Sequence, residues 1–390
     1  MKRLLIWLLV CLGVWTPAAH ANEWQSVQQL HRQSAAGWHQ TIQAGRRTVV
    51  IDIDIDVPDV QAAPVLRIAR GSTAYTPQAQ PDELLYIFNG GGIPDYSGCF
   101  ALVHDAPDGE YFWDKGGLNR RQPAEWKNAY TQVYVWLRPW DMQRTCTQGN
   151  PYPLDDAVRD VQALLDRATD RQLQFSLDTV ETVGIYSVKE WTGQTPILGE
   201  LLAPEYYRLK CTQHLRGLPL LRAMDIELMN NDAPKNVQKH AVFAPGDAVV
   251  RIASASSYSF GVRPVHETAV LHDDIPLCPL ATIRQSIEKL IVSGHLRSVH
   301  SLRFGLVAYD DPDSADGIIA MPAWVVKGNY YRNPAVSDNP WNSFTPDGKA
   351  FIGGANNYLT DIVINAQTGR TLIDLTNVRD VLAPEVVTKQ

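Results

Sequence analysis

The stretch of residues 278–374 constrains the fold of this chain most strongly, because it predicts one helix followed by strands. Residues 280–291 carry apolar side chains at the three- and four-residue spacing of an amphipathic helix. The residues after it are rich in Val, Ile and aromatic side chains at strand lengths, in the stretches 299–309, 318–331 and 359–374, the last a hairpin that turns at 366–369. We therefore predict a helix packed on an antiparallel sheet.

A second stretch of the same kind precedes it. Residues 154–168 have an amphipathic helical pattern and follow a proline-rich boundary at 150–153. Strands are then predicted at 175–191, 205–216, 220–229 and 248–259, with a hairpin turn at Arg216 and Gly217. We predict an α+β fold built from tandem units of a helix packed on an antiparallel sheet, the C-terminal unit being the clearest.

The predicted divisions of the chain follow from these two units. They are a signal peptide, an N-terminal α+β region, a middle helix-plus-antiparallel-sheet unit and a C-terminal helix-plus-sheet unit, at residues 1–21, 22–150, 151–275 and 276–390. Within the N-terminal region, apolar spacing predicts an amphipathic helix over residues 23–42, ended by Gly45.

Residues 51–57 alternate strictly between aliphatic and acidic side chains. Their three Asp residues, at 52, 54 and 56, suggest a calcium site as one hypothesis. A calcium loop of the EF-hand type needs a glycine turn and a distal Glu, and it is not interleaved with Ile. The alternation is typical of a half-buried strand, so we favour a strand with an acidic solvent face.

The first residues indicate export. Lys2 and Arg3 precede an apolar run, and Ala19-His20-Ala21 matches a cleavage signal, so we predict a signal peptide cleaved near Ala21. The alternative of an uncleaved anchor helix is disfavoured, because the apolar run is too short to span a bilayer. Cys11 lacks the small preceding residue of a lipidation site, so we expect a secreted or extracytoplasmic protein without a lipid anchor.

The charge distribution argues against two classes of partner. The chain has 35 basic and 42 acidic residues, a formal net charge of −7, with neither a basic run nor a basic helix. Nucleic acid and anionic lipid surfaces are normally bound through such basic stretches. We therefore expect neither as a partner.

Four cysteines remain after the predicted cleavage: Cys99, Cys146, Cys211 and Cys278. An even number in an exported protein predicts two disulfides, with three connectivities open. We favour Cys99–Cys146 with Cys211–Cys278, since each pair lies within or beside one region. The alternative is four reduced, buried thiols. None of the spacings resembles a paired C-x-x-C zinc site.

Two stretches are candidate interaction surfaces. Residues 111–142 are dense in aromatic side chains, which would serve either a buried core or a platform that stacks on sugars; the platform residues would be Trp113, Trp126, Trp136 and Trp140. We favour the core.

Residues 331–349 are rich in Pro, Asn, Ser and Asp and predict a long loop, the place where an interaction surface is most expected.

The common catalytic motifs are missing from the sequence. It contains no G-x-S-x-G elbow, H-E-x-x-H helix or G-x-G-x-x-G turn, and His266 and His272 lack the spacing of a zinc protease. We therefore nominate no catalytic, cofactor-binding or metal-ligating residue. We expect no cofactor, and the absence of motifs lowers the odds of an enzyme.

Several short segments carry a family likeness. Taken together, they resemble an uncharacterised family of exported proteins of Gram-positive gut-type bacteria (domain of unknown function 6034), and they lie at 49–59, 64–68, 207–221, 322–328 and 364–372. The Pro322-x-Trp324 strand and the hairpin after Asn365 are also similar to PepSY-type domains and to the extracytoplasmic YycH and YycI regulators of a sensor kinase. The likeness implies PepSY- or cystatin-like units and provides no catalytic residues.

These observations lead to one functional expectation and one alternative. We expect an exported, non-enzymatic protein-binding or regulatory module of the cell envelope, whose partner is another extracytoplasmic or membrane protein. The alternative is a cell-wall or glycan-binding or hydrolysing protein that uses the aromatic cluster of residues 111–142.

Overall fold

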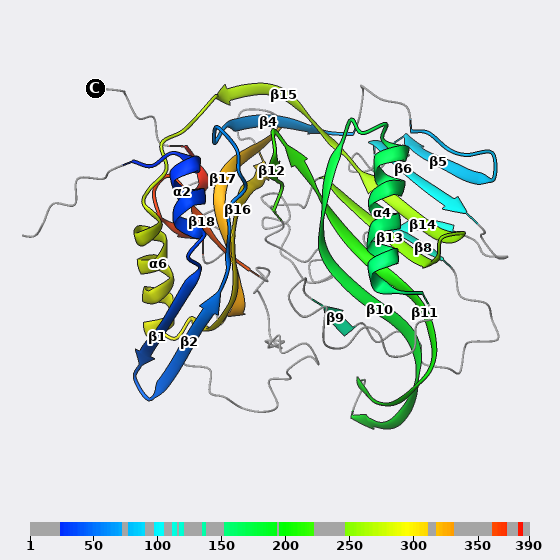
Figure 1. Cartoon of the computed structure of the whole chain (residues 1–390), viewed down its shortest axis with the longest axis horizontal. Helices are drawn as coiled ribbons and strands as arrows, with labels where there is room; N and C mark the ends of the chain where they lie inside the picture. The colour runs from blue at the N-terminus through cyan, green and yellow to red at the C-terminus, as the bar shows by residue number, and fades with distance from the viewer. Residues whose placement is uncertain are drawn as a thin grey trace, which may run out of the picture.

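The computed structural model describes residues 24–71, 77–89, 97–104, 111–114, 117–120, 135–137, 152–192, 195–221, 246–310, 317–330, 361–372 and 381–384. These residues form a mixed α+β fold, as predicted, in which most strands belong to two sheets (Figure 1). We name each after one of its strands, the β17 sheet and the β11 sheet.

The β17 sheet holds strands from both ends of the chain. Its strand order is β15 (Val265–His272), β4 (Val65–Arg70), β17 (Ile318–Tyr330), β16 (Leu296–Asp310) and β3 (Ile55–Asp56), while β18 (Ile362–Asn365) pairs with β17 and β19 (Thr371–Leu372) with β18. Its pairs are antiparallel except β16 with β3. Helix α6 (Leu280–Val292), helix α2 (Val27–Ser34) and a ribbon of β1 (Trp38–Ala44) and β2 (Arg47–Ile53) lie beside it (Figure 1).

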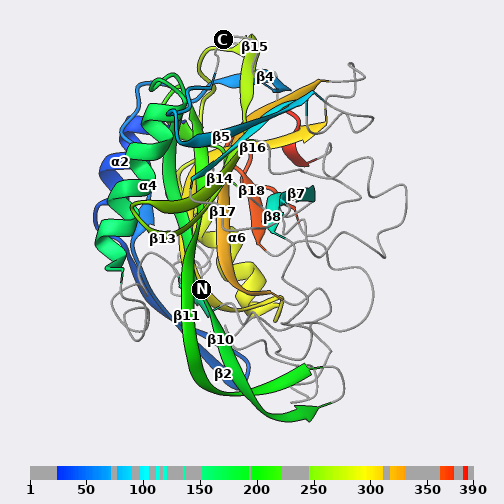
Figure 2. The same ribbon diagram turned by 90° about the vertical axis from the view of Figure 1, so that its right-hand side faces the viewer.

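The β11 sheet forms the other half of the molecule. Its order is β5 (Glu83–Asn89), β6 (Ser97–His104), β14 (Ser257–Arg263), β13 (Asp247–Ser254), β11 (Thr195–Leu215), β10 (Gln174–Thr192) and β9 (Val135–Leu137), with β12 (Leu218–Pro219) paired to β11. Helix α4 (Leu154–Ala168) covers one face (Figure 1). A separate hairpin joins β7 (Tyr111–Asp114) to β8 (Gly117–Arg120). Register shifts along β10 and β11 accompany the curved end of their long hairpin (Figure 2).

Both long helices that the sequence predicted are confirmed. α4 and α6 each begin directly after a proline, Pro153 or Pro279, which occupies the N-cap position without a side-chain cap. Their buried residues recur at helical spacing, so one face of each helix packs on its sheet. The predicted strand over residues 248–259 is two strands, β13 and β14, because the chain turns at residues 255–256.

The predicted helix over residues 23–42 is wrong beyond its first half. α2 starts with a capping box of Ser26 and Gln29 and ends before Gly37, whose φ of +64° breaks the helix. Trp38 then begins strand β1, and its buried side chain packs in the core from the strand. The three- and four-residue spacing of Trp38 from the helical residues misled the prediction.

The acidic strand is confirmed. β2 and β3 bury Ile51, Ile53 and Ile55, and they expose the aspartates between them. Among the described residues, no group of three or more His, Cys, Asp or Glu side chains lies close enough to hold a metal ion. The structure therefore gives this stretch the strand role and offers no support for the calcium hypothesis.

The strand pairing does not keep residues 22–150 together as one region. β3 and β4 join the β17 sheet, whereas β5 and β6 join the β11 sheet. The chain crosses back at Pro264, because β14 belongs to the β11 sheet and β15 to the β17 sheet. The predicted middle unit of residues 151–275 therefore gives its last strand to the other sheet. These crossings depend on pairing between distant strands, which local patterns do not encode.

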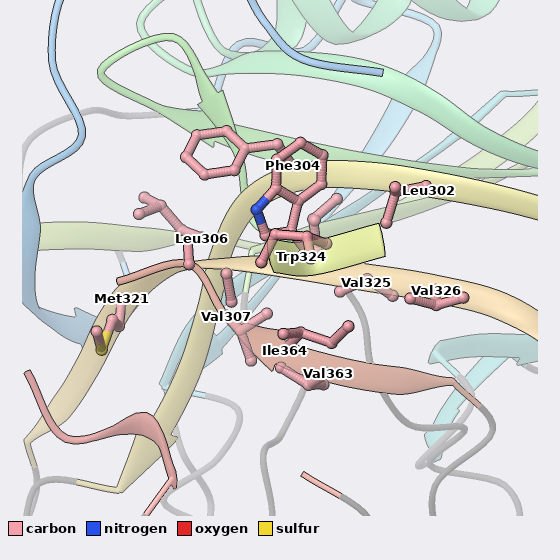
Figure 3. Close-up of a cluster of buried hydrophobic side chains, with 14 of the residues drawn as sticks. Leu302, Phe304, Leu306, Val307, Met321, Trp324, Val325, Val326, Val363 and Ile364 are labelled. Carbon is pink, nitrogen blue, oxygen red and sulfur yellow. The ribbon is translucent and has the colours of Figure 1, made fainter. Parts of the chain in front are cut away.

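Each sheet has its own hydrophobic core. The larger core surrounds the β16–β17 hairpin, where the rings of Phe304 and Trp324 meet edge to face at 5.2 Å (Figure 3). The smaller core lies between α4 and the β11 sheet and contains Phe260, Tyr207 and Leu165. Helix α6 therefore packs in the core of the β17 sheet, and helix α4 packs in the core of the β11 sheet.

One segment of the β11 sheet enters the core of the other. After the turn at Arg216 and Gly217, both with positive φ, Leu218, Leu220 and Leu221 are buried in the larger core. The Leu221 amide donates to the Leu306 carbonyl at 2.7 Å. A Cβ atom on Gly305 would lie 2.5 Å from the Pro219 carbonyl oxygen, so this approach requires a glycine on β16. We call residues 218–221 the linking segment.

We predict that Gly305→Ala destabilises the protein by roughly 3 kcal/mol, because the new methyl group collides with the backbone of the linking segment. Gly45→Ala is the matched control. Its Cβ would meet no atom within 4 Å, and only its φ of +65° resists the change, at a cost of about 1 kcal/mol. Urea unfolding of both variants measures the difference, and an equal loss of free energy would contradict the close contact.

Candidate functional site

The β11 sheet has one apolar and one polar face. Tyr207, Leu209 and Cys211 alternate along β11 and pack in the core under α4. Arg208 and Lys210, between them, point to the opposite face, yet they are only 4% and 6% exposed. Buried cations are held by polar or charged partners, so this face is an organised polar surface.

Neighbouring strands extend the polar face. Arg251 on β13 is the cross-strand neighbour of Arg208. Asp247 on β13 accepts hydrogen bonds from Arg263 on β14, one of them at 2.6 Å from the Arg263 Nε atom. The guanidinium approaches both carboxylate oxygens, which is the geometry of a bidentate ion pair.

A charged cluster joins the polar faces of the two sheets. Arg303 on β16 donates to Asp178 on β10 at 2.5 Å and to Asp56 on β3 at 3.3 Å, and the Lys327 ammonium lies 3.6 Å from Asp178. Burial alone would lower the pKa of Arg303, but Asp178 and Asp56 outweigh it and raise that pKa. Asp178 lies at a register shift between β10 and β11, which frees it from the regular ladder.

A serine and a histidine lie beside this cluster. The His214 Nε2 atom is 2.8 Å from the Ser176 hydroxyl. Burial, reinforced by the nearby Arg303, lowers the pKa of His214 despite the opposing effects of the Gly217 backbone and Asp56. A serine nucleophile and the histidine that acts as its base make the same contact in hydrolytic enzymes. Among the described residues, however, the backbone of Gly217 takes the place of the carboxylate that orients the base in a catalytic triad.

A second buried ion pair fixes α4. The side chain of Glu83 on β5 is fully buried and accepts hydrogen bonds from Arg167 on α4 and Tyr258 on β14. Burial would raise the pKa of Glu83, but the Arg167, Tyr258 and Gln80 hydrogen bonds lower it overall. Glu83 is therefore ionised at neutral pH and serves to attach the last turn of α4 to the sheet.

A hollow of about 310 Å³ opens at the end of the β1–β2 ribbon. The ribbon turn, the end of α6 and the start of β16 form its walls. Its lining includes the basic residues Arg46, Arg47 and Arg297 and the aliphatic residues Ala44, Val49, Ile291, Val292 and Leu296. We call it the arginine hollow. Sequence reasoning missed it, and the paired arginines after Gly45 were the available signal.

The structure places only part of the predicted aromatic platform. Trp113 lies on β7 and Trp136 on β9, but the positions of their side chains are outside the described part of the structure. Trp126 and Trp140 lie outside the described residues, as does the loop at 331–349. The glycan-stacking hypothesis and the loop hypothesis therefore stay predictions.

The predicted Cys211–Cys278 disulfide is wrong. Both residues are free thiols, and each is buried in a different core, Cys211 under α4 and Cys278 beside α6. Burial raises the pKa of each thiol to about 12. The other predicted pair lies outside the description, since Cys146 is not described and Cys99 is placed on β6 without its side chain.

Comparison with known proteins gives little further information. No family model matches the chain, and no curated protein matches it. The chain is similar to a crystal structure of an uncharacterised protein from Eubacterium rectale ATCC 33656, with 12% sequence identity and a TM-score of 0.46. The match covers 86% of this chain and 93% of that one. A likeness this distant carries no argument about function. Within the described part of the chain, none of the helices has the length and apolar character needed to cross a bilayer.

We predict that His214 makes the protein less stable as the pH falls. Its pKa is lowered on folding, so the unfolded chain takes up a proton near the ordinary value of 6.5 before the folded chain does. This contribution to stability is complete above pH 6.5 and decreases as the pH falls towards the folded pKa.

The slope is at most about 1.4 kcal/mol per pH unit. Urea unfolding between pH 7.5 and 5 should therefore show a smaller loss of stability for His214→Gln than for the wild type. Parallel pH profiles of the two proteins would show that His214 is not held neutral by its surroundings.

Proposed function

We propose that this chain is an exported, non-enzymatic binding or regulatory module of the cell envelope, and that it contacts another extracytoplasmic or membrane protein. The outer face of the β1–β2 ribbon supports this proposal best. The ribbon hydrogen-bonds to no other strand within the described residues. Its inner face packs in the larger core through Trp38, Ile42 and Ile51, so the ribbon is firmly attached.

The outer face has the composition of a protein contact. Thr41 lies opposite Val50 and Gln43 opposite Thr48, and all four residues are exposed. Val50 is 65% exposed, one of the few large hydrophobic side chains exposed in the described part of the chain. At one end of the same face, the exposed side chains of His39 and Asp52 pair at 2.6 Å. An exposed aliphatic side chain with uncharged neighbours and charged residues at the rim is typical of an interface. The whole chain has a net charge of −7, so a face with few charged side chains differs from the rest of the surface. It is the best candidate for the surface that contacts a partner.

The assignment of the two halves to a known type of unit is part of the same proposal. We infer that the two helix-on-sheet halves are units of the PepSY or cystatin kind, since each has a helix packed on an antiparallel sheet. Export rests on the sequence of the first residues, which lie outside the described part of the chain. The glycan alternative has no comparable observation in its favour, because the side chains of the platform tryptophans are not described.

We predict that Val50→Glu abolishes capture of the partner, because it replaces the exposed aliphatic side chain of this face with a charge. The purified chain without residues 1–21 would be immobilised and exposed to a detergent extract of the native cell envelope. Ala281→Glu is the matched control, since it adds the same charge at an exposed alanine of α6. A protein retained by the wild type and by the control, but lost with Val50→Glu, is the expected result. Equal capture by all three chains, or recovery of wall glycan in place of a protein, would contradict the proposal.

A further inference from the structure

The serine–histidine pair of the β11 sheet is partly open to solvent. The His214 Nε2 atom is 2.8 Å from the Ser176 hydroxyl, and each residue is partly buried. Ser176 lies opposite Thr212 in the pairing of β10 with β11, so Ser176 and His214 are diagonal neighbours on one face of the sheet. Two paired strands therefore hold the hydroxyl and the imidazole in contact.

The backbone of Gly217 orients the ring of His214. It hydrogen-bonds the ring and raises the pKa of His214, and a backbone group has this effect when it accepts a proton from the ring. A neutral imidazole has a single N–H group. With this group directed to the Gly217 carbonyl, the Nε2 atom is the acceptor, and the hydroxyl of Ser176 donates to it.

The surroundings also keep the imidazole neutral. Burial lowers the pKa of His214 most, and the cation Arg303 lowers it further, whereas Gly217 and Asp56 act in the opposite direction without cancelling the shift. Hydrogen bonds to Asp178 and Asp56 hold Arg303 in this position. A neutral imidazole is the form of histidine that accepts a proton, so His214 is a base in contact with a hydroxyl.

We propose that Ser176 is a nucleophile that accepts an acyl group from an activated ester, with His214 as its base. The Ser176 Oγ atom attacks the carbonyl carbon while its proton passes to the His214 Nε2 atom. The bond to the leaving alcohol then breaks, and the alcohol takes this proton from His214, so that an acyl-serine and a free alcohol remain.

The proposed reaction ends at the acyl-serine. The pair supplies a nucleophile and a base, so the ester must itself carry a good leaving group. This covalent acceptor site goes beyond the proposed protein contact, which uses the outer face of the β1–β2 ribbon. Its test needs no partner protein, so the two proposals fail or succeed separately.

Labelling of the whole chain with an alkyl fluorophosphonate tests the proposal. The Oγ–P bond forms, the P–F bond breaks, and fluoride leaves while the serine proton passes to solvent through His214. We expect one label per chain, placed on Ser176 by peptide mass spectrometry. Ser176→Ala should lose this label, and His214→Gln should be labelled at least about tenfold more slowly, because it lacks the base. Circular dichroism would verify that both variants are folded.

A second serine–histidine contact is a control within the same chain. On β16 the Ser298 hydroxyl is 2.9 Å from the His300 Nε2 atom, and each residue is partly buried. If a base oriented by Gly217 and kept neutral by its surroundings activates the serine, Ser176 should be labelled at least about tenfold faster than Ser298. Equal rates at the two serines would overturn the proposal.

The pH dependence of labelling separates a base from a structural contact. An ordinary histidine is half protonated at pH 6.5, whereas His214 takes up its proton at a lower pH because its pKa is lowered. The wild type should therefore keep more than half of its pH 7.5 labelling rate at pH 6.5. No label on Ser176, or an unchanged rate in His214→Gln, would overturn the proposal and leave the pair a structural hydrogen bond.

Discussion

The contact between the linking segment and β16 holds this molecule together. Pro219 meets the backbone at Gly305, and Leu220 and Leu221 lie against Leu306 inside the core of the other sheet. Beside this apolar contact, Arg303 spans the same boundary and reaches Asp178 on β10. The hydrophobic burial supplies the stabilisation, and the charged cluster fixes the orientation of the two sheets, because a buried cation tolerates few positions for its partners.

This boundary also explains why the molecule is not a simple chain of domains. The N-terminal strands β3 and β4 lie in the sheet of the C-terminal strands, and β15 closes the same sheet after the chain has passed through the other one. At this crossing, the side-chain amide of Gln213 exchanges two hydrogen bonds with the backbone of Val265, at 2.9 and 3.0 Å. The Gln213 side chain thus makes the two hydrogen bonds to Val265 that the backbone of a neighbouring strand would otherwise make.

Local patterns in the sequence predicted the elements better than their assembly. Strict alternation around Ile51 and Ile53 predicted a strand, and helical spacing over residues 154–168 predicted α4, because each signal is contained within one element. The pairing of β4 with β15 joins residues 195 to 207 positions apart, and no local pattern specifies it. Cys211 and Cys278 were paired in the prediction by proximity along the chain, whereas the fold buries them in separate cores. The arginine hollow has the same origin, since Arg46 and Arg297 come to line one hollow only after the ribbon packs beside α6.

We infer that the two sheets form one cooperative unit, and the two buried thiols offer a direct test of this cooperativity. Cys211 reports on the core under α4 and Cys278 on the core of the β17 sheet, and both are unreactive while buried. A thiol reagent would be applied in short pulses along a urea titration, and labelling at each cysteine would be read by peptide mass spectrometry. If the linking segment couples the sheets, both cysteines become labelled at the same urea concentration. Two separate midpoints would show that the sheets unfold as independent domains and would contradict this account.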